Sequence, residues 1–289
     1  ADNASSFIYE SGLGSFSRSE LDKYLSGIIV NVNPYIGYYD EGLSGSTSPK
    51  DLETFFQLIY SYFTQPKIDS IAFLSLKSKM KSYLENMSNE PAVAFRDTLD
   101  VTLANYHFRN RPFTVKLLDE IDMNKSISIY KNRFADASDF TFIFAGNIDL
   151  STFKPLVENY LGGLPSLNRN EKPIDLKYTN IKGEINKEVR KGIEQKSSVA
   201  IAYVGDMKWS RKNEYTMESL MDVLNIKLRE AIREEKGGTY GISGYHQIYR
   251  IPESHYTINI NFGCNPDRVD ELVATVFQVM DSIKTFGPD

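Results

Sequence analysis

Hydrophobic and polar positions follow two different periods along this chain, and the changes of period mark helices and strands. From Leu52 to Phe63 apolar residues recur at helical spacing, directly after Ser48 and Pro49, which form a helix start signal. Ser17 to Glu20 have the spacing of a capping box, so a helix is expected to begin there. The same criteria predict helices over residues 69–86, 92–106, 124–134, 150–161, 213–235 and 267–285.

Runs rich in β-branched and aromatic residues lie between these helices and predict strands. Two of them, residues 28–32 and 35–39, flank Pro34 and are expected to form a hairpin or adjacent strands. Residues 139–145 have the pattern of a buried strand. Further strands are predicted over residues 197–204, 240–249 and 256–262. The polar stretch 166–180 has neither period, so we expect it to link two domains.

Composition and charge limit the classes of function. The chain has 289 residues with 33 Lys and Arg against 38 Asp and Glu, a formal charge of −5, which disfavours nucleic acid as a partner. The longest apolar runs, 140–145 and 199–204, are far shorter than the ~20 residues that cross a bilayer. The sequence starts Ala1-Asp2-Asn3 without methionine or a signal peptide, so we expect a processed or excised piece whose native ends are missing.

Few residues suit metal or nucleophilic chemistry. Zinc hydrolase motifs need two histidines one helical turn apart beside a carboxylate, and His107, His246 and His255 are not spaced in this way. We therefore predict no metal in this chain. The motifs for acyl-serine, P-loop and dinucleotide chemistry are absent from the sequence. The single cysteine, Cys264, has no obvious base nearby in sequence and is expected to act as a small hydrophobe.

One segment, from Leu228 to Ser243, combines a helix end with potential chemistry. Arg233 is expected in the last turns of the long helix, Gly237 and Gly238 end it, and Tyr240 opens the next strand. A guanidinium and a phenol are then able to meet at one corner of the fold. The alternative is structural: Arg233 complements the helix C-terminus and Tyr240 packs at a strand edge.

This segment resembles the arginine–tyrosine signature in the C-terminal half of the pitrilysin/insulysin family, zinc metallopeptidases with an inverted His-x-x-Glu-His motif. Residues 12–27, 134–149 and 160–165 resemble segments of that family in the same order. The resemblance implies an α+β fold with two α/β domains like those of pitrilysin and the mitochondrial processing peptidase. Each is a mainly antiparallel sheet packed with helices. Residues 1–166 match the third domain type and 181–289 the fourth, joined by a linker at 167–180, and both domains are expected to be truncated.

The same resemblance implies a function. In that family the zinc ligands and the catalytic glutamate belong to the N-terminal half, so zinc is expected there and not in this chain. Arg233 would bind a substrate backbone carbonyl, and Tyr240 would donate its hydroxyl to the carbonyl of the scissile bond as it becomes an oxyanion. The implied partners are the N-terminal half of the same polypeptide and a peptide substrate. Alone, this chain is expected to be inactive. We expect the protein to be located in the bacterial periplasm or cell envelope.

Two other functions are compatible with the sequence. Some members of this fold have lost the zinc motif and serve as non-catalytic scaffold or peptide-binding subunits. An unrelated α/β binding protein would require the ordered segments to match by chance. The presence of both Arg233 and Tyr240 favours the peptidase interpretation.

Overall fold

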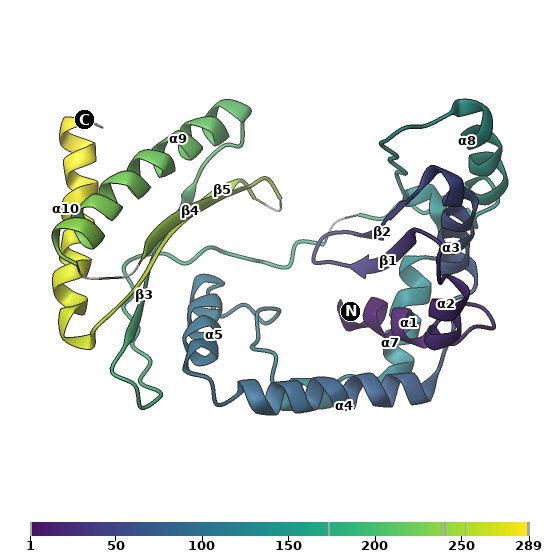
Figure 1. The fold of residues 1–289 in the computed structure, drawn as a ribbon, viewed down its shortest axis with the longest axis horizontal. Coiled ribbons are helices and arrows are strands. Elements are labelled where there is room, and N and C mark those ends of the chain that lie inside the picture. The colour runs from purple at the N-terminus through teal and green to yellow at the C-terminus, as the bar shows by residue number, and fades with distance from the viewer. Residues whose placement is uncertain (1, 173, 238, 240, 252, 288–289) are drawn as a thin grey trace. The chain divides into compact units, whose positions relative to one another are not determined.

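The computed structural model describes residues 2–172, 174–237, 239, 241–251 and 253–287 (Figure 1). They form two compact units. Unit 1 comprises residues up to Asn86 together with Phe113–Ile174, and unit 2 comprises Met87–Pro112 and Asp175 onward. The chain therefore passes between the units near residues 86, 112 and 174. The division into family domains at residues 167–180 stays a prediction.

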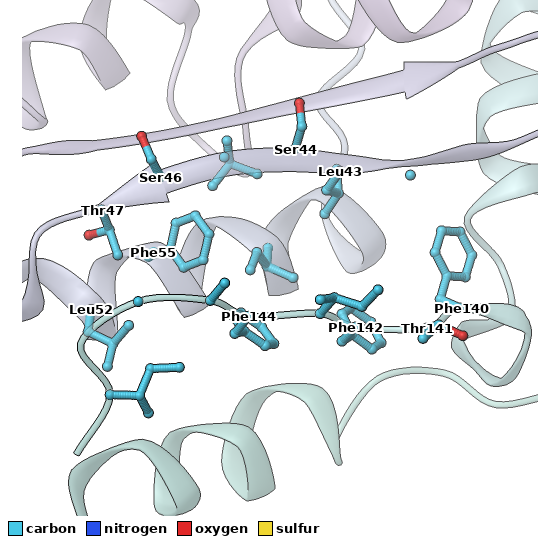
Figure 2. Close-up of a pocket in the computed structure, with 18 of the residues that line it drawn as sticks. Leu43, Ser44, Ser46, Thr47, Leu52, Phe55, Phe140, Thr141, Phe142 and Phe144 are labelled. Carbon is cyan, nitrogen blue, oxygen red and sulfur yellow. The ribbon is translucent and has the colours of Figure 1, made fainter. Parts of the chain in front are cut away.

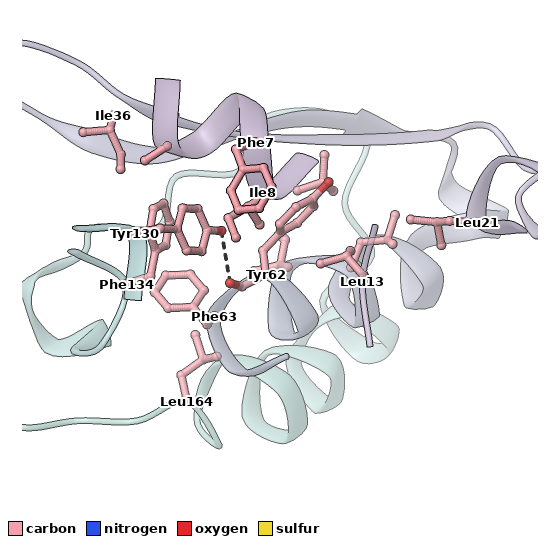
Figure 3. Close-up of a cluster of buried hydrophobic side chains, with 14 of the residues drawn as sticks. Phe7, Ile8, Leu13, Leu21, Ile36, Tyr62, Phe63, Tyr130, Phe134 and Leu164 are labelled. Carbon is pink, nitrogen blue, oxygen red and sulfur yellow. Dashed lines mark hydrogen bonds between the residues drawn. The ribbon is translucent and has the colours of Figure 1, made fainter. Parts of the chain in front are cut away.

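Helix α3 (Leu52–Thr64) is the centre of the hydrophobic core of unit 1. Its apolar stripe is buried, as the period predicted, and it packs beside α1 (Asp2–Ser11) and α7 (Met123–Arg133). Figure 3 shows rings of all three segments converging. Tyr130, which is fully buried, donates a hydrogen bond to the backbone carbonyl of Tyr62 at 3.1 Å and so joins α7 to α3. Helix α1 was not predicted.

A hairpin covers one side of α3. Strands β1 (Val30–Ile36) and β2 (Glu41–Thr47) pair antiparallel, so the predicted second strand at 35–39 was wrong. Residues 37–40 make the turn, where the Gly37 amide donates to the Asp40 carbonyl at 2.7 Å. β2 escaped detection because its glycines and serines lack β propensity. Gly45 is needed for close packing, since a Cβ there would lie 2.8 Å from the Phe55 ring.

The predicted strand at 139–145 is extended but belongs to no sheet in the described part of the chain. Its burial alternates: Phe140, Phe142 and Phe144 are half-buried, whereas Ile143 is 85% exposed. The Phe144 ring stacks on Phe56 at 5.4 Å between centroids. The predicted buried strand is thus wrong in two respects: only every second side chain is half-buried, and the described residues supply no strand to pair with this segment.

The remaining elements of unit 1 are short or peripheral. They are α2 (Arg18–Tyr24), η1 (Pro49–Asp51), α4 (Ser70–Met87), α6 (Val115–Asp119), η2 (Ala137–Asp139), α8 (Leu150–Leu156) and η3 (Val157–Leu161). The capping box of α2 is confirmed: the Ser17 hydroxyl accepts from the Glu20 amide, and the Glu20 carboxylate accepts from the Ser17 amide at 2.8 Å.

Unit 2 is a three-stranded antiparallel sheet with helices on one face. β5 (His255–Cys264) is central, between β3 (Ser197–Asp206) and β4 (Ile242–Tyr249). Helices α9 (Arg211–Leu228) and α10 (Val269–Phe286) pack side by side over it (Figure 1). Ile260 on β5 and Leu272 and Val276 on α10 are fully buried between them. The unit also contains α5 (Pro91–Leu103), η4 (Arg229–Glu235) and η5 (Pro266–Arg268).

The α+β fold class is confirmed, with helices packed on antiparallel sheets. Helix α5 ends three residues before the predicted 106. Asn105 and Tyr106 have φ values of 48° and 56°, a left-handed conformation that a helix does not continue through. The charged stretch 183–190, whose polar and apolar residues alternate in part, lies outside all helices and strands.

Asp136 is a buried carboxylate that connects two segments of unit 1. It is 2% exposed and accepts hydrogen bonds from the amides of Leu167 (2.8 Å) and Arg169 (2.7 Å) and from the amide and hydroxyl of Ser138. Burial raises the pKa of Asp136, but these hydrogen bonds outweigh it and hold the pKa well below its ordinary value. The carboxylate thus fixes residues 167–169 onto η2.

Because the pKa of Asp136 is lowered by folding, its stabilising effect is present above the unfolded-state pKa of about 3.9 and is lost as pH falls below it. We expect Asp136→Asn to lower the unfolding temperature of unit 1 at neutral pH, since an amide oxygen cannot replace both carboxylate oxygens. The difference from wild type should shrink as pH falls below about 4. Scanning calorimetry at several pH values measures this difference in unfolding temperature, and Asp139→Asn, at an exposed position, is the control. An equal deficit at all pH values would contradict this account.

Candidate functional site

The predicted site lies at the end of the long helix of unit 2. α9 begins at Ser210, whose hydroxyl accepts a hydrogen bond from the Asn213 amide at 3.1 Å. Met217, Met221, Leu224 and Leu228 form its buried stripe. The helix continues as one wider, π-helical segment, η4, in which Ile232 is fully buried. This core contact fixes the backbone beside Arg233.

Arg233 has an exposed side chain in the last turn of η4. Its guanidinium forms no ion pair with any side chain that the structure describes. A cation at this position complements the partial negative charge of a helix C-terminus, which is the structural alternative for this residue. Its exposure equally leaves the five guanidinium donors open to a ligand.

The connection from η4 to β4 is held against α10 at its start. Lys236 pairs with Glu271 of α10 at 3.2 Å, and Arg268 donates to the Lys236 carbonyl at 3.2 Å and to the Glu271 carboxylate at 3.0 Å. Gly237 has φ +53°, the left-handed conformation predicted for the helix end. The Thr239 hydroxyl accepts from the Gly241 amide and donates to the Gly241 carbonyl at 3.0 Å.

Tyr240, the second predicted site residue, lies outside the described residues, as does Gly238. The predicted meeting of the Arg233 guanidinium with the Tyr240 hydroxyl therefore stays a prediction. Among the described residues on either side, Gly237 follows the helical segment with a positive φ, and β4 begins at Ile242, after the predicted start.

The histidines occupy three separate places. The His107 ring contacts the Leu176 carbonyl at 3.0 Å, His246 is on β4, and His255 on β5 is buried against Tyr249 with its Nδ1 2.8 Å from the Glu253 carbonyl. No group of three or more His, Cys, Asp or Glu side chains that suits a metal ion occurs among the described residues. These residues therefore do not fit a zinc ion, and no catalytic step through zinc is assigned to them.

Cys264, at the end of β5, is half-buried, and burial raises the pKa of its thiol, which fits the expected role of a small apolar side chain. Within the described residues, no helix combines the length and hydrophobicity needed to cross a membrane.

Unit 1 contains a cavity of about 1030 Å³ that was not predicted from the sequence. It is lined by β2, α3 and residues 139–149 (Figure 2). The sequence feature beside it is the aromatic run 139–145, which predicts a strand and borders this cavity.

Comparison with known proteins identifies the family. The family model described as "Peptidase M16 inactive domain" matches residues 121–289. The chain is 26% identical over 292 aligned residues to "Probable zinc protease PqqL" of Haemophilus influenzae, covering 99% of this chain and 30% of that protein. It thus spans less than a third of that relative's length.

Solved structures agree in fold. "The crystal structure of the periplasmic protease PqqL from Escherichia coli" superposes with a TM-score of 0.83 at 21% identity, covering 96% of this chain and 31% of that one. "Crystal Structure of pitrilysin" gives a TM-score of 0.67 at 12% identity, covering 99% and 32% respectively.

The family match extends over more than half of the chain and includes the whole helix–turn–strand region around Arg233. Together with the zinc-protease relative and the pitrilysin-like fold, it confirms the resemblance on which the site was predicted. The chain belongs to the M16 (pitrilysin/insulysin) family of zinc metallopeptidases, to the inactive domain of its C-terminal half.

Proposed function

We propose that this chain is the substrate-binding C-terminal half of a zinc metalloendopeptidase, and that it closes over peptides held by an N-terminal half of the same polypeptide. The observation that supports the proposal is that Arg233 is exposed in the last turn of η4, directly after the buried Ile232, in a chain of this family. The zinc and the catalytic glutamate are then contributed by the N-terminal half.

Arg233 suits the binding of a peptide backbone. Its guanidinium offers several donors in a fixed plane, and carbonyl oxygens of an extended peptide are acceptors that need such donors. Because Ile232 is buried and Lys236 is held by Glu271, the backbone around Arg233 is ordered before substrate arrives. Less conformational entropy is then lost on binding.

Tyr240 suits the stabilisation of developing charge. A phenol hydroxyl is a neutral donor, and a donor aimed at an oxyanion typically accelerates acyl transfer by ~10²–10³. Its neighbour Gly241 is fixed by the two hydrogen bonds to Thr239. We assign Tyr240 this assisting role; the hydrolytic water and its activation belong to the N-terminal half.

A non-catalytic scaffold is the second candidate, favoured by the description of the matching family as an inactive domain. A scaffold of this fold would still bind peptides but would not cleave them with any N-terminal partner. For location, we propose the bacterial periplasm, because the similar Escherichia coli protein is described as a periplasmic protease.

A complementation assay separates these candidates. We expect no cleavage of a quenched fluorescent peptide by this chain alone or by the N-terminal half of the proposed polypeptide alone, and chelator-sensitive cleavage when the two are mixed. Analytical ultracentrifugation of the mixture reports whether they assemble. An assembled mixture that cuts no peptide would reject the peptidase and leave the scaffold.

Tyr240→Phe keeps the ring and removes the donor. In the assembled enzyme, kcat should fall by ~10²–10³ while the unfolding temperature stays near that of wild type. Tyr245→Phe, an exposed tyrosine on β4, is the matched control and should keep wild-type kcat. Wild-type turnover by Tyr240→Phe would reject the oxyanion role.

Arg233→Lys keeps the charge and removes the planar fork. Peptide KM should rise by about tenfold, since one charge-assisted contact is lost from ground state and transition state alike. Arg229→Lys, one helical turn earlier and also exposed, is the control and should not change KM. If both variants keep wild-type kinetics, Arg233 serves only to complement the helix end.

A further inference from the structure

Helix α9 and strand β4 are joined directly by the side chain of Asn225. The Asn225 Oδ1 accepts a hydrogen bond from the Gly244 amide at 2.7 Å, and the Asn225 Nδ2 donates to the Gly244 carbonyl at 2.9 Å. The side-chain amide is therefore bonded to both backbone groups of one residue. Asn225 is half-buried and directly follows Leu224, which belongs to the buried stripe of α9.

This pairing takes the place of a neighbouring strand at Gly244. Gly244 is opposite Ile260 of β5, but both of its backbone groups bond to Asn225, so they are directed away from β5. Because inward and outward residues alternate in an antiparallel pair, Ser243 and Tyr245 direct their backbone groups to β5. The side chain of Asn225 thus offers one acceptor and one donor, as the backbone of a paired strand does.

Glycine at position 244 permits the close approach of helix and strand. A Cβ at Gly244 would lie 2.6 Å from the terminal methyl group of Met221, which is one turn before Asn225 on α9. The helix and the strand are therefore in contact at this point, and the two hydrogen bonds fix the position of one along the other. We call Asn225 and Gly244, with these two hydrogen bonds, the α9–β4 clasp.

The clasp closes a loop of chain, residues 225–244, that contains both residues assigned to the site. The helix continues through η4 to Arg233, eight residues after Asn225. Tyr240 precedes Gly244 by four residues. The connection between η4 and β4 contains Gly237, Gly238 and Gly241. Because glycine leaves the backbone wide conformational freedom, this connection does not by itself determine where β4 starts.

The two ends of the connection are held by different contacts. At its start, Lys236 pairs with Glu271 of α10 at 3.2 Å, and Arg268 donates to the Lys236 carbonyl. Near its end, the Thr239 hydroxyl bonds to the Gly241 backbone, which is a contact within the connection itself. The clasp is the contact that joins the strand after this connection to the helix before it.

We propose that Asn225 is a positioning residue for the proposed active site: it holds Gly244 and thereby sets where β4, and the tyrosine before it, starts relative to α9. This inference rests on the proposed function for the role of Tyr240. Asn225 acts through the backbone and not by contact with substrate. Placement matters because a donor must point at the developing oxyanion, and an error of about 1 Å costs up to ~10² in rate.

Amide exchange tests the clasp without an assay of activity. In the 289-residue chain, Asn225→Leu keeps a similar shape but has no hydrogen-bonding group, and it should speed exchange of the Gly244 amide by about tenfold or more. Exchange of the Tyr245 amide, which is directed to β5, should stay within about twofold of wild type. Unchanged exchange at Gly244, or an equal increase at both amides, would overturn the clasp.

Kinetics test the positioning role. In the assembled enzyme, Asn225→Leu should lower kcat by about tenfold with little change in peptide KM, because the buried Ile232 still fixes the backbone beside Arg233. In the Tyr240→Phe background the same substitution should lower kcat by no more than about twofold, since the hydroxyl that it displaces is already gone. An equal tenfold loss in both backgrounds would overturn the role, because loss of folded enzyme reduces both by the same factor.

Two further variants separate hydrogen bonding from volume and from stability. Asn225→Asp keeps the shape and the acceptor, but a carboxylate has no donor for the Gly244 carbonyl, so kcat should fall as in Asn225→Leu. Asn213→Leu is the matched control: the Asn213 Nδ2 donates to the Lys208 carbonyl at 2.8 Å, at the opposite end of α9. This variant loses a comparable bond and should keep wild-type kcat. Wild-type kcat in Asn225→Asp, or an equal loss in Asn213→Leu, would reject the inference.

Failure of this inference and failure of the proposed function give different results. A wild-type assembly that cuts no peptide would reject the peptidase and with it the catalytic role of the clasp, whereas faster exchange at Gly244 in Asn225→Leu would still establish that Asn225 holds β4. An active assembly in which Asn225→Leu keeps wild-type kcat would reject the inference alone.

Discussion

The apolar face of α3 is the constraint on which unit 1 depends. Phe55, Phe56 and Phe63 contact the β1–β2 hairpin on one side and the extended segment 140–144 on the other. Burying one such side chain contributes about 1.5–3 kcal/mol. Contacts with α3 therefore hold the hairpin and the extended segment in place, although the two are not paired with each other. A helix therefore sets the spacing of two strand edges that share no hydrogen bond in the described chain.

In unit 2, helices pack on a sheet whose strands are hydrogen-bonded to one another. Its three strands form one sheet, and α9 and α10 pack on it to form a single hydrophobic cluster. Leu228 and Ile232 are both fully buried four residues apart, which carries the core stripe from α9 into η4 and orients the next residue, Arg233, outward. The ion pair of Lys236 with Glu271 then ties the turn to α10.

The sequence predicted those features that depend on local period and capping. The helix over 52–63, the capping box at Ser17 and Glu20 and the strands of unit 2 are of this kind. β2 was missed because pairing with β1 and contact with Phe55 outweigh the poor propensity of its glycines and serines. The strand predicted at 139–145 was wrong for a different reason. The segment is extended, but no neighbouring strand in the described chain pairs with it. At the site, the position of Arg233 was predictable, whereas its meeting with Tyr240 depends on a turn geometry that period alone does not fix.

The exposure of the Arg233 side chain affects how strongly this residue can bind a peptide. In the proposed role, the Arg233 guanidinium binds a neutral backbone carbonyl, and this attraction is weaker in water than where water is excluded, because electrostatic energy falls as the effective dielectric rises. An exposed guanidinium thus binds a peptide weakly until a second surface excludes water from the contact. A rigid turn on a complete core keeps the donors in place during that closure, and the covering surface supplies the low dielectric. If the proposed function holds, binding energy becomes available only when both halves of the peptidase enclose the substrate.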